Sequence, residues 1–248
     1  MKNDKMIKKK WYIPILLSTV IILSIVLLII VLNTDEINDN YSKKVLASNS
    51  LGNVTLKGPF GNENSEVKIA FIIGVHPLES NSHMALINLI QNKSESLNHS
   101  YYIYIINVTK DKNDFDKGRL NGQLLARDYV VPHIIKSNYT LVVDIHSHRK
   151  DYIEDNFIIS PINDEKSAMI GNKIIKEITG MHILKFIPAT DNSPSSPDYV
   201  TIPIIKNGTP SLIYETLLKE PNNITYSYLS QFIENLDNLN FNDFTQTS

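Results

Sequence analysis

Apolar and polar residues alternate in blocks along most of the chain, and their spacing predicts strands and helices in turn. Short runs of consecutive apolar residues are typical of strands that are buried on both faces of a sheet. Longer segments with apolar residues three or four positions apart are typical of helices that bury one side. The expected strands are residues 67–73, 101–108, 140–145 and 211–214, and the expected helices are 82–91, 123–135, 164–179 and 226–236. This order predicts an α/β fold with a mainly parallel (mixed) sheet flanked by helices.

The longest apolar stretch lies near the N-terminus, where residues 12–32 contain no charged side chain. A helix of about 21 residues, at about 1.5 Å per residue, crosses a hydrocarbon core of roughly 30 Å. No Ala-x-Ala pattern follows, so we interpret the stretch as an N-terminal transmembrane helix, a signal anchor rather than a cleaved signal peptide. Lysines precede it and Asp35 and Glu36 follow it. The positive-inside rule then predicts a single-pass membrane protein with a cytoplasmic N-terminus and the remaining chain outside.

The chain divides by composition into three parts. Residues 1–33 form the basic segment and the anchor, and residues 34–65 are polar without a sustained period, which predicts a tether with a short strand near residues 54–56. Residues 66–248 carry the alternating strands and helices. This last part is long enough for one hydrophobic core and is expected to be the catalytic domain.

Charge and cysteine content exclude several function classes. The net charge is −2, and no basic stripe remains once the N-terminal lysines are assigned to topology, so we expect no nucleic-acid partner. The absence of cysteine excludes disulfides, thiolate metal sites and cysteine nucleophiles. Asn-x-Ser/Thr triplets fit an external glycoprotein, although a chain rich in these residues also produces them by chance. The triplets begin at Asn53, Asn92, Asn98, Asn107, Asn138, Asn207 and Asn223.

His76 and Glu79 follow the first predicted strand directly, at the point where the chain turns into a helix. In open α/β folds this carboxyl edge of the sheet is where ligands bind, and a histidine and a carboxylate are ligands that zinc accepts. The His-x-x-Glu pattern alone is a weak signal, so the prediction depends on its position after the strand. Two other interpretations remain open: Glu79 complements the helix dipole, or Glu79 pairs with His83 one helical turn later.

Two further residues end later predicted strands. His146 follows the apolar run 140–145 and is a candidate third ligand, because two histidines and one carboxylate leave a position open for water, as in catalytic zinc sites. His148 lies on the same side of that strand, but His146 follows the run directly and is preferred. Glu215 ends the strand 211–214, where it is a candidate proton acceptor or, alternatively, a helix cap or ion-pair partner.

These residues resemble the motifs of the zinc carboxypeptidase superfamily, including the succinylglutamate desuccinylase/aspartoacylase-like deacylases. The matching elements are His76-x-x-Glu79, Asp144-Ile145-His146-Ser147 and Glu215, and the resemblance covers residues 67–216. It implies a zinc-carboxypeptidase-like fold in which His76, Glu79 and His146 bind Zn²⁺. It also implies that Glu215 acts as general base and then as general acid.

The resemblance further implies an arginine that polarises the scissile carbonyl or binds a substrate carboxylate. The chain has only three arginines against 21 lysines, and a retained arginine suggests a need for planar, bidentate donation. Arg119 is the preferred catalytic candidate, in an expected loop over residues 116–122, and Arg149 is the second choice. Arg127 lies in a predicted helix and is interpreted as a surface residue.

Two features depart from the family pattern. The usual Asn-Arg pair is absent, because Asn121 is followed by Gly122. The substrate tyrosine of the peptidases has no clear counterpart, although Tyr199 at the end of the polar stretch 191–199 is a candidate. Together with Arg149, Asn121 and Tyr199 are the expected substrate-binding residues.

The sequence therefore predicts a membrane-anchored, extracellular, zinc-dependent amide hydrolase. A carboxypeptidase acting on peptides, including cell-wall peptides, is the first choice, and a deacylase of N-acyl amino acids or amino sugars is the second. A third interpretation is a non-catalytic surface binding module whose metal site is lost or structural. Another divalent ion that accepts histidine and carboxylate remains an alternative to zinc.

Overall fold

The computed structural model of the chain describes residues 20–25, 41–185 and 195–244. The chain divides into two compact units, Met1–Asn40 and Tyr41–Ser248. Within the first unit residues 20–25 are helical, and most of the predicted membrane span 12–32 lies outside the described residues. Among the residues that are described, no helix is long and apolar enough to cross a membrane.

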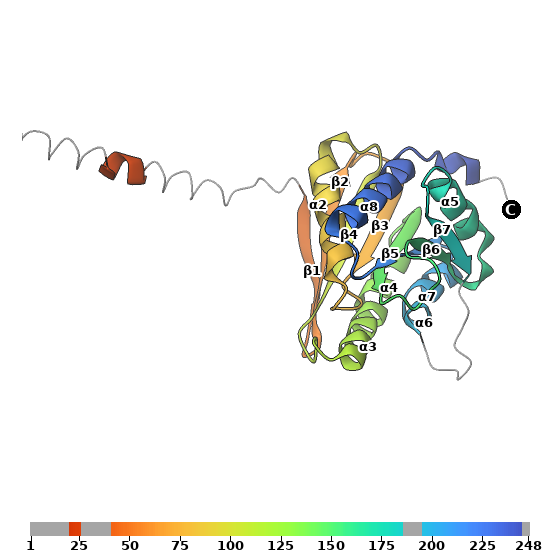
Figure 1. Cartoon of the computed structure of the whole chain (residues 1–248), viewed down its shortest axis with the longest axis horizontal. Helices are drawn as coiled ribbons and strands as arrows, with labels where there is room; N and C mark the ends of the chain where they lie inside the picture. Colours follow the sequence, from red (N-terminus) through yellow and green to blue (C-terminus); the bar gives the residue numbers. More distant parts are fainter. Residues whose placement is uncertain (1–19, 26–40, 186–194, 245–248) are drawn as a thin grey trace, which may run out of the picture. The chain divides into compact units, whose positions relative to one another are not determined.

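The second unit is built on one mixed sheet in the order β1-β2-β4-β3-β5-β8-β6-β7 (Figure 1). Its strands are β1 (Ser42–Ser48), β2 (Gly52–Gly61), β3 (Lys68–Ile73), β4 (Ser100–Val108), β5 (Leu141–His148), β6 (Phe157–Ser160), β7 (His182–Lys185) and β8 (Ser211–Leu217). The central strands β4, β3, β5 and β8 are parallel to one another. Antiparallel pairs join β1 to β2, β2 to β4, and β6 to β8. The predicted α/β fold with a mixed sheet is confirmed.

Helices cover both faces of the sheet, with α2, α5 and α8 over one face and α3, α4 and α7 over the other (Figure 1). Their bounds are α2 (Ser80–Lys93), α3 (Phe115–Leu125), α4 (Val131–Ile135), α5 (Glu165–Ile175), α6 (Ser196–Tyr199), α7 (Thr201–Lys206) and α8 (Asn222–Asp237). A π-helical turn over Ala126–Val130 joins α3 to α4. Because both faces are covered, the central strands are apolar along their whole length rather than alternating.

The strand β3 illustrates how the two cores share one strand. Its odd-numbered residues, such as Phe71, belong to the core beneath α2 and α8, and its even-numbered residues, such as Ile72, belong to the core beneath α3 and α4. Side chains alternate from face to face along a strand, so one apolar run supplies both layers. The same alternation in β5 assigns Val143 to the first core and puts His146 on the side of the second.

The predicted tether over residues 34–65 is wrong from residue 42 onward, except that the short strand expected near residues 54–56 is part of β2. Residues 42–61 form the hairpin β1-β2, and β2 pairs antiparallel with β4. Val54 and Phe60 are buried, whereas β1 is largely exposed. A hairpin at the edge of a sheet has polar residues on its solvent side, and these gave the segment the composition of a linker.

The helix expected from residue 123 begins eight residues earlier, at Phe115. Asp114 caps it, because its side chain accepts a hydrogen bond from the backbone N–H of Lys117 at 2.9 Å. The predicted loop 116–122 is therefore helical, and Arg119 lies on α3. An aspartate before a polar first turn is a known helix-start signal, so this boundary was readable from the sequence.

Candidate active site

The loop between β3 and α2 places His76 and Glu79. Gly74 turns the chain out of the strand with φ 83°, and a Cβ at this position would lie 2.0 Å from the carbonyl oxygen of Ile106. A side chain is thus excluded both by the backbone conformation and by the neighbouring strand. Glu79 directly precedes the first residue of α2, and its Oε1 lies 2.9 Å from Nδ1 of His76.

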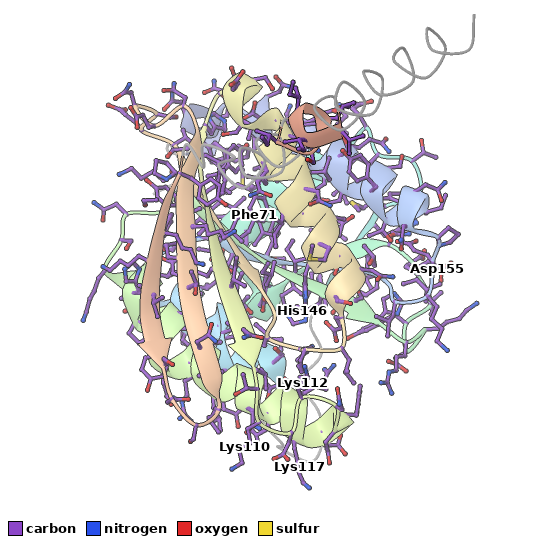
Figure 2. The ribbon with its side chains drawn as sticks, turned by 90° about the vertical axis from the view of Figure 1, so that its left-hand side faces the viewer. Phe71, Lys110, Lys112, Lys117, His146 and Asp155 are labelled. Atoms are coloured by element: carbon purple, nitrogen blue, oxygen red, sulfur yellow. The ribbon has the colours of Figure 1, made fainter. Side chains whose placement is uncertain are left out.

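The strand β5 brings His146 to the same point. Its Nδ1 lies 2.9 Å from Nδ1 of His76 and 3.0 Å from Oε2 of Glu79. The three side chains are buried, and their nearest ligand atoms all lie within 4.8 Å of one another. In Figure 2 His146 lies inside the molecule near the first turn of α2, whereas Lys110, Lys112 and Lys117 project at the surface. The structure thus brings the three predicted metal ligands together.

The carboxylate of Glu79 is held by donors from two other elements. The backbone N–H of Ser147 donates to Oε2 at 3.0 Å, and Nη1 of Arg119 donates to Oε1 at 2.9 Å. The hydroxyl of the same Ser147 lies 2.9 Å from the hydroxyl of Ser82 and 3.2 Å from the hydroxyl of Thr216. These contacts connect α2, α3, β5 and β8 around one carboxylate, which fixes its position.

The two imidazoles turn the same ring atom toward the cluster. Nε2 of His146 lies 2.9 Å from Oδ2 of the buried Asp144, close enough for an ion pair although not aligned as a hydrogen bond. On the other ring, Nε2 of His76 lies 3.5 Å from the amide nitrogen of Gln123. Partners on the outer ring nitrogen orient histidine ligands in metal sites, which leaves both Nδ1 atoms facing inward.

The pKa shifts of the three ligands differ in direction, and His146 would have to release a proton on binding a cation. Burial, aided by the nearby His146, lowers the pKa of His76 to about 3, so this ring is neutral near neutral pH. Burial alone would raise the pKa of Glu79, but hydrogen bonds from His146 and His76 hold it well below its usual range. Burial likewise opposes the charge on His146, yet Asp144 and Glu79 raise its pKa well above the ordinary value. Two imidazoles and an ionised carboxylate converging in a buried site fit a zinc ion with an open position.

Glu215 lies beside this cluster. It occupies the position on β8 directly opposite His146 on β5, and it lines the same pocket as His76 and Glu79. Burial raises the pKa of Glu215 to about 8, against a smaller opposing effect of His146. Its Oε2 has no hydrogen-bond partner among the described residues. A carboxyl group with a pKa near neutrality and a free oxygen is suited to accept and return a proton.

The pocket above the cluster has a volume of about 120 Å³. Its lining combines His76 and Glu79 of the cluster with residues of α3, of the ends of β5 and β8 and of the loops that follow them: His76, Pro77, Leu78, Glu79, Phe115, Arg119, Ser147, His148, Arg149, Asp151, Tyr152, Glu215 and Leu218. The guanidinium groups of Arg119 and Arg149 lie 5.0 and 4.0 Å from the centre of the Phe115 ring. Both candidate arginines therefore reach the pocket, held against one aromatic side chain.

Two predicted substrate-binding residues lie elsewhere. Asn121 is buried in α3, where its side-chain amide donates to the carbonyl oxygen of Lys110 at 2.9 Å, so it holds the preceding loop instead of lining the pocket. Tyr199 ends the short helix α6, and its ring lies 6.0 Å from the guanidinium of Arg127. It does not line the pocket either: α6 packs against α7 and α3, and Tyr199 packs against the second core.

The alternative histidines have structural contacts. His83 is buried, its Nε2 lies 3.1 Å from the carbonyl oxygen of Ile145, and it is not among the clustered ligand atoms. Burial lowers the pKa of His83 to about 4, which keeps it neutral. Nδ1 of His148 accepts from the backbone N–H of Lys150, so its Nε2 donates to the carbonyl oxygen of Asp155. His146 is therefore the histidine of β5 that joins the cluster.

Sequence reasoning missed two aromatic residues of the pocket. Tyr152 lies in the loop after β5, and Phe115 begins α3 between the two arginines. Tyr152 also packs against the ring of His148, with centroids 5.3 Å apart. Its position six residues after His146, in a polar segment, was the one available signal. Nothing local in the sequence pointed to Phe115, because its contacts depend on how α3 packs.

Comparison with known proteins identifies the fold. No family model matches the chain, and neither does any curated protein. A metallo-carboxypeptidase from Burkholderia cenocepacia matches with a TM-score of 0.54 and 11% identity, over 79% of this chain and 64% of that one. A Shewanella denitrificans protein described as a metallopeptidase matches with a TM-score of 0.52 and 12% identity, over 82% and 86%. The cell shape determinant protein Csd4 from Helicobacter pylori matches with a TM-score of 0.47 and 14% identity, over 79% and 54%.

The chain thus has a metallo-carboxypeptidase-like fold, as expected from its resemblance to the zinc carboxypeptidase superfamily. The identities are low, so the likeness concerns the fold. The chain spans 54% of the length of Csd4 and 64% of that of the Burkholderia protein.

Proposed function

We propose that this chain is a zinc-dependent amide hydrolase, and more specifically a carboxypeptidase that acts on peptides, including peptides of the cell wall. The observation that carries the proposal is the buried cluster of His76, Glu79 and His146 with Glu215 beside it in one pocket. The solved structures that share the fold include proteins named as a metallo-carboxypeptidase and a metallopeptidase, which favours peptides over acyl amino acids as first substrates.

His76, Glu79 and His146 would hold the ion through their inward-facing atoms. A zinc ion there supplies Lewis acidity, which polarises a carbonyl group and activates water. The role of Glu215 follows from its place opposite His146: its carboxylate accepts a proton from the attacking water and passes it to the nitrogen of the departing amine. A bound cation would lower the pKa of Glu215 from about 8 and so favour the carboxylate form that accepts the proton.

The two arginines supply positive charge at the pocket. Arg119 already uses Nη1 to bind Glu79, so its remaining N–H groups are the ones available to a carbonyl or carboxylate oxygen. The guanidinium of Arg149 stacks on Phe115 and can donate in a planar, bidentate way. We assign Arg119 to the oxyanion that develops at the scissile carbonyl and Arg149 to a carbonyl or carboxylate oxygen elsewhere on the substrate.

The test is Glu215→Gln in the full chain, assayed on peptides with a free C-terminus. We expect kcat to fall by about 10² to 10⁴, the usual contribution of a general base, with the zinc content unchanged. Glu177→Gln is the matched control, because its side chain, in the turn after α5, is 77% exposed and does not line the pocket. If Glu215→Gln keeps full activity, Glu215 is not the base. If the native chain binds zinc but cleaves neither peptides nor N-acyl amino acids, a binding module is the better interpretation.

We further propose that residues 12–32 anchor the chain in the cell membrane and that the catalytic unit lies outside. The proposal rests on the uncharged apolar run and on the lysines before it. A C-terminal epitope tag on the full chain tests it. We expect externally added protease to remove the tag from intact cells, and a tag that is protected until the cells are lysed would contradict this topology.

A further inference from the structure

A second cavity, of about 440 Å³, adjoins the candidate active site. It is lined by His148, Arg149, Lys150, Leu217, Leu218 and Lys219. Three of these residues, His148, Arg149 and Leu218, also line the pocket above the metal cluster, so the two spaces are neighbours. We call the second space the basic cavity.

The sheet itself positions this cavity. Beyond the pair His146–Glu215, β5 and β8 stay paired to His148 and Leu217, and the backbone N–H of Leu218 donates to the carbonyl oxygen of His148 at 2.8 Å. The next residues of both strands therefore leave the sheet side by side. The residues that line the cavity thus lie about three positions after His146 and Glu215 along the two strands, which is about 10 Å at the usual strand rise.

The turn after β5, which carries the cationic residues Arg149 and Lys150, is fixed by contacts with His148. Lys150 has φ 70°, a conformation uncommon for a residue with a side chain, and its backbone N–H donates to Nδ1 of His148 at 3.1 Å. The opposite ring nitrogen of His148 donates to the carbonyl oxygen of Asp155 at 3.0 Å. His148 is buried, so one fixed ring holds both ends of the loop that carries Arg149 and Lys150.

The charges of the two spaces differ. Carboxylates of Glu79, Asp151 and Glu215 line the active-site pocket, whereas the basic cavity has three cationic side chains and no carboxylate in its lining. Its remaining wall is formed mainly by Leu217 and Leu218. Among the described residues, no carboxylate forms an ion pair with Lys150 or Lys219. Unpaired lysines around an apolar floor suit a side chain with a methylene stem and an anionic end.

We propose that the basic cavity is a substrate subsite for an acidic residue of the peptide, about three residues before the scissile bond. This inference rests on the proposed function, because a carboxypeptidase substrate continues away from the metal on the amino side. A glutamate at that position would lay its methylene groups on Leu217 and Leu218 and place its carboxylate between Lys150 and Lys219.

The test uses N-acetylated hexapeptides with a free C-terminus that carry either Glu or Gln three residues before the scissile bond. Cleavage is measured as kcat/KM with the zinc-loaded full chain. Binding is measured as Kd by fluorescence anisotropy of labelled peptides with the zinc-loaded Glu215→Gln chain. Lys150→Asn tolerates the left-handed turn, and Lys219→Gln removes the second charge. Lys206→Gln, at the exposed end of α7, is the matched control.

We expect the native chain to prefer the Glu peptide by about tenfold in both measurements, with about threefold lost for each lysine removed. The preference should also shrink as salt rises, because these charges are exposed to solvent. The control variant Lys206→Gln should keep the full preference for the Glu peptide.

Equal cleavage and equal binding of the two peptides would overturn the subsite while leaving the hydrolase intact. Preferential, lysine-dependent binding of the Glu peptide without cleavage of either would uphold the cavity as a binding site and overturn the proposed hydrolysis. If neither peptide is bound or cleaved, both proposals fail.

Discussion

His146 and Glu215 lie opposite each other on the adjacent parallel strands β5 and β8. On the other side of β5, the neighbouring strand β3 leads into the loop that carries His76 and Glu79. Three adjacent parallel strands thus end at one edge and supply the whole candidate site. This arrangement explains how residues separated by up to 139 positions in the chain, His76 and Glu215, meet at one pocket.

The double substitution His76→Ala/Glu79→Ala should abolish metal binding. It removes two of the three converging ligands, and one histidine alone does not hold zinc. We expect about one zinc per native chain by mass spectrometry and none in the variant. The control is His182→Ala/Glu177→Ala, which removes the same residue types at exposed positions. Equal zinc content in the native and His76→Ala/Glu79→Ala chains would place the metal elsewhere or exclude it.

Asp144→Asn should weaken zinc binding without unfolding the chain. The carboxylate lies 2.9 Å from Nε2 of His146, on the ring atom turned away from the cluster, so it orients the ligand and increases its basicity. Such outer partners typically change metal affinity by about 10- to 100-fold. Competition with a chromogenic chelator measures the change in Kd, and the exposed Asp243→Asn is the control. An unchanged Kd would show that β5 alone orients His146.

Gly122→Ala should displace the loop that holds His76. A Cβ at Gly122 would lie 2.0 Å from the carbonyl oxygen of Val75, a contact with backbone that no rotamer relieves. We expect a loss of about 1–3 kcal/mol in the free energy of unfolding, together with weaker zinc binding. Gly118→Ala, one turn earlier on α3, meets its nearest neighbour at 3.1 Å and should have a smaller effect. Denaturant titration and chelator competition on both variants would reveal the difference, and equal effects would contradict the prediction.

His83 should make the fold sensitive to acid between about pH 6.5 and pH 4. Burial lowers its pKa in the folded chain to about 4 from the ordinary 6.5. Above pH 6.5 the ring is neutral in both states, and below that value the unfolded chain binds a proton that the folded chain does not. The free energy of unfolding therefore falls by about 3 kcal/mol over this interval, with no further loss below pH 4.

Denaturant unfolding of the full chain at pH 7.0 and pH 4.5 measures this loss. The matched variant is His83→Gln, which retains an amide donor for the carbonyl oxygen of Ile145 but does not titrate. We expect the pH-dependent loss to be smaller in the variant than in the native chain. The same loss in both would assign the acid sensitivity to other groups.

Local pattern in the sequence was sufficient for the central strands, the main helices, the three clustered residues and Glu215. His76, His146 and Glu215 each follow an apolar run, and the carboxyl ends of parallel strands meet at one edge, so the topology class alone predicted their meeting. The same reasoning failed for residues 42–61, because an edge hairpin with one solvent face has the composition of a linker. It also failed for the start of α3, where the cap at Asp114 was overlooked.

The sequence by itself thus determined the α/β alternation, the order of the chemical motifs and the candidate ligand set, because these depend on periods and neighbours along the chain. Tertiary structure decided which other side chains reach the pocket. In the folded chain Asn121 donates to the carbonyl oxygen of Lys110, and Tyr199 lies beside Arg127. Phe115 and Tyr152 line the pocket instead. Contacts of this kind depend on how separate elements pack, and packing joins residues whose distance along the chain carries no local signal.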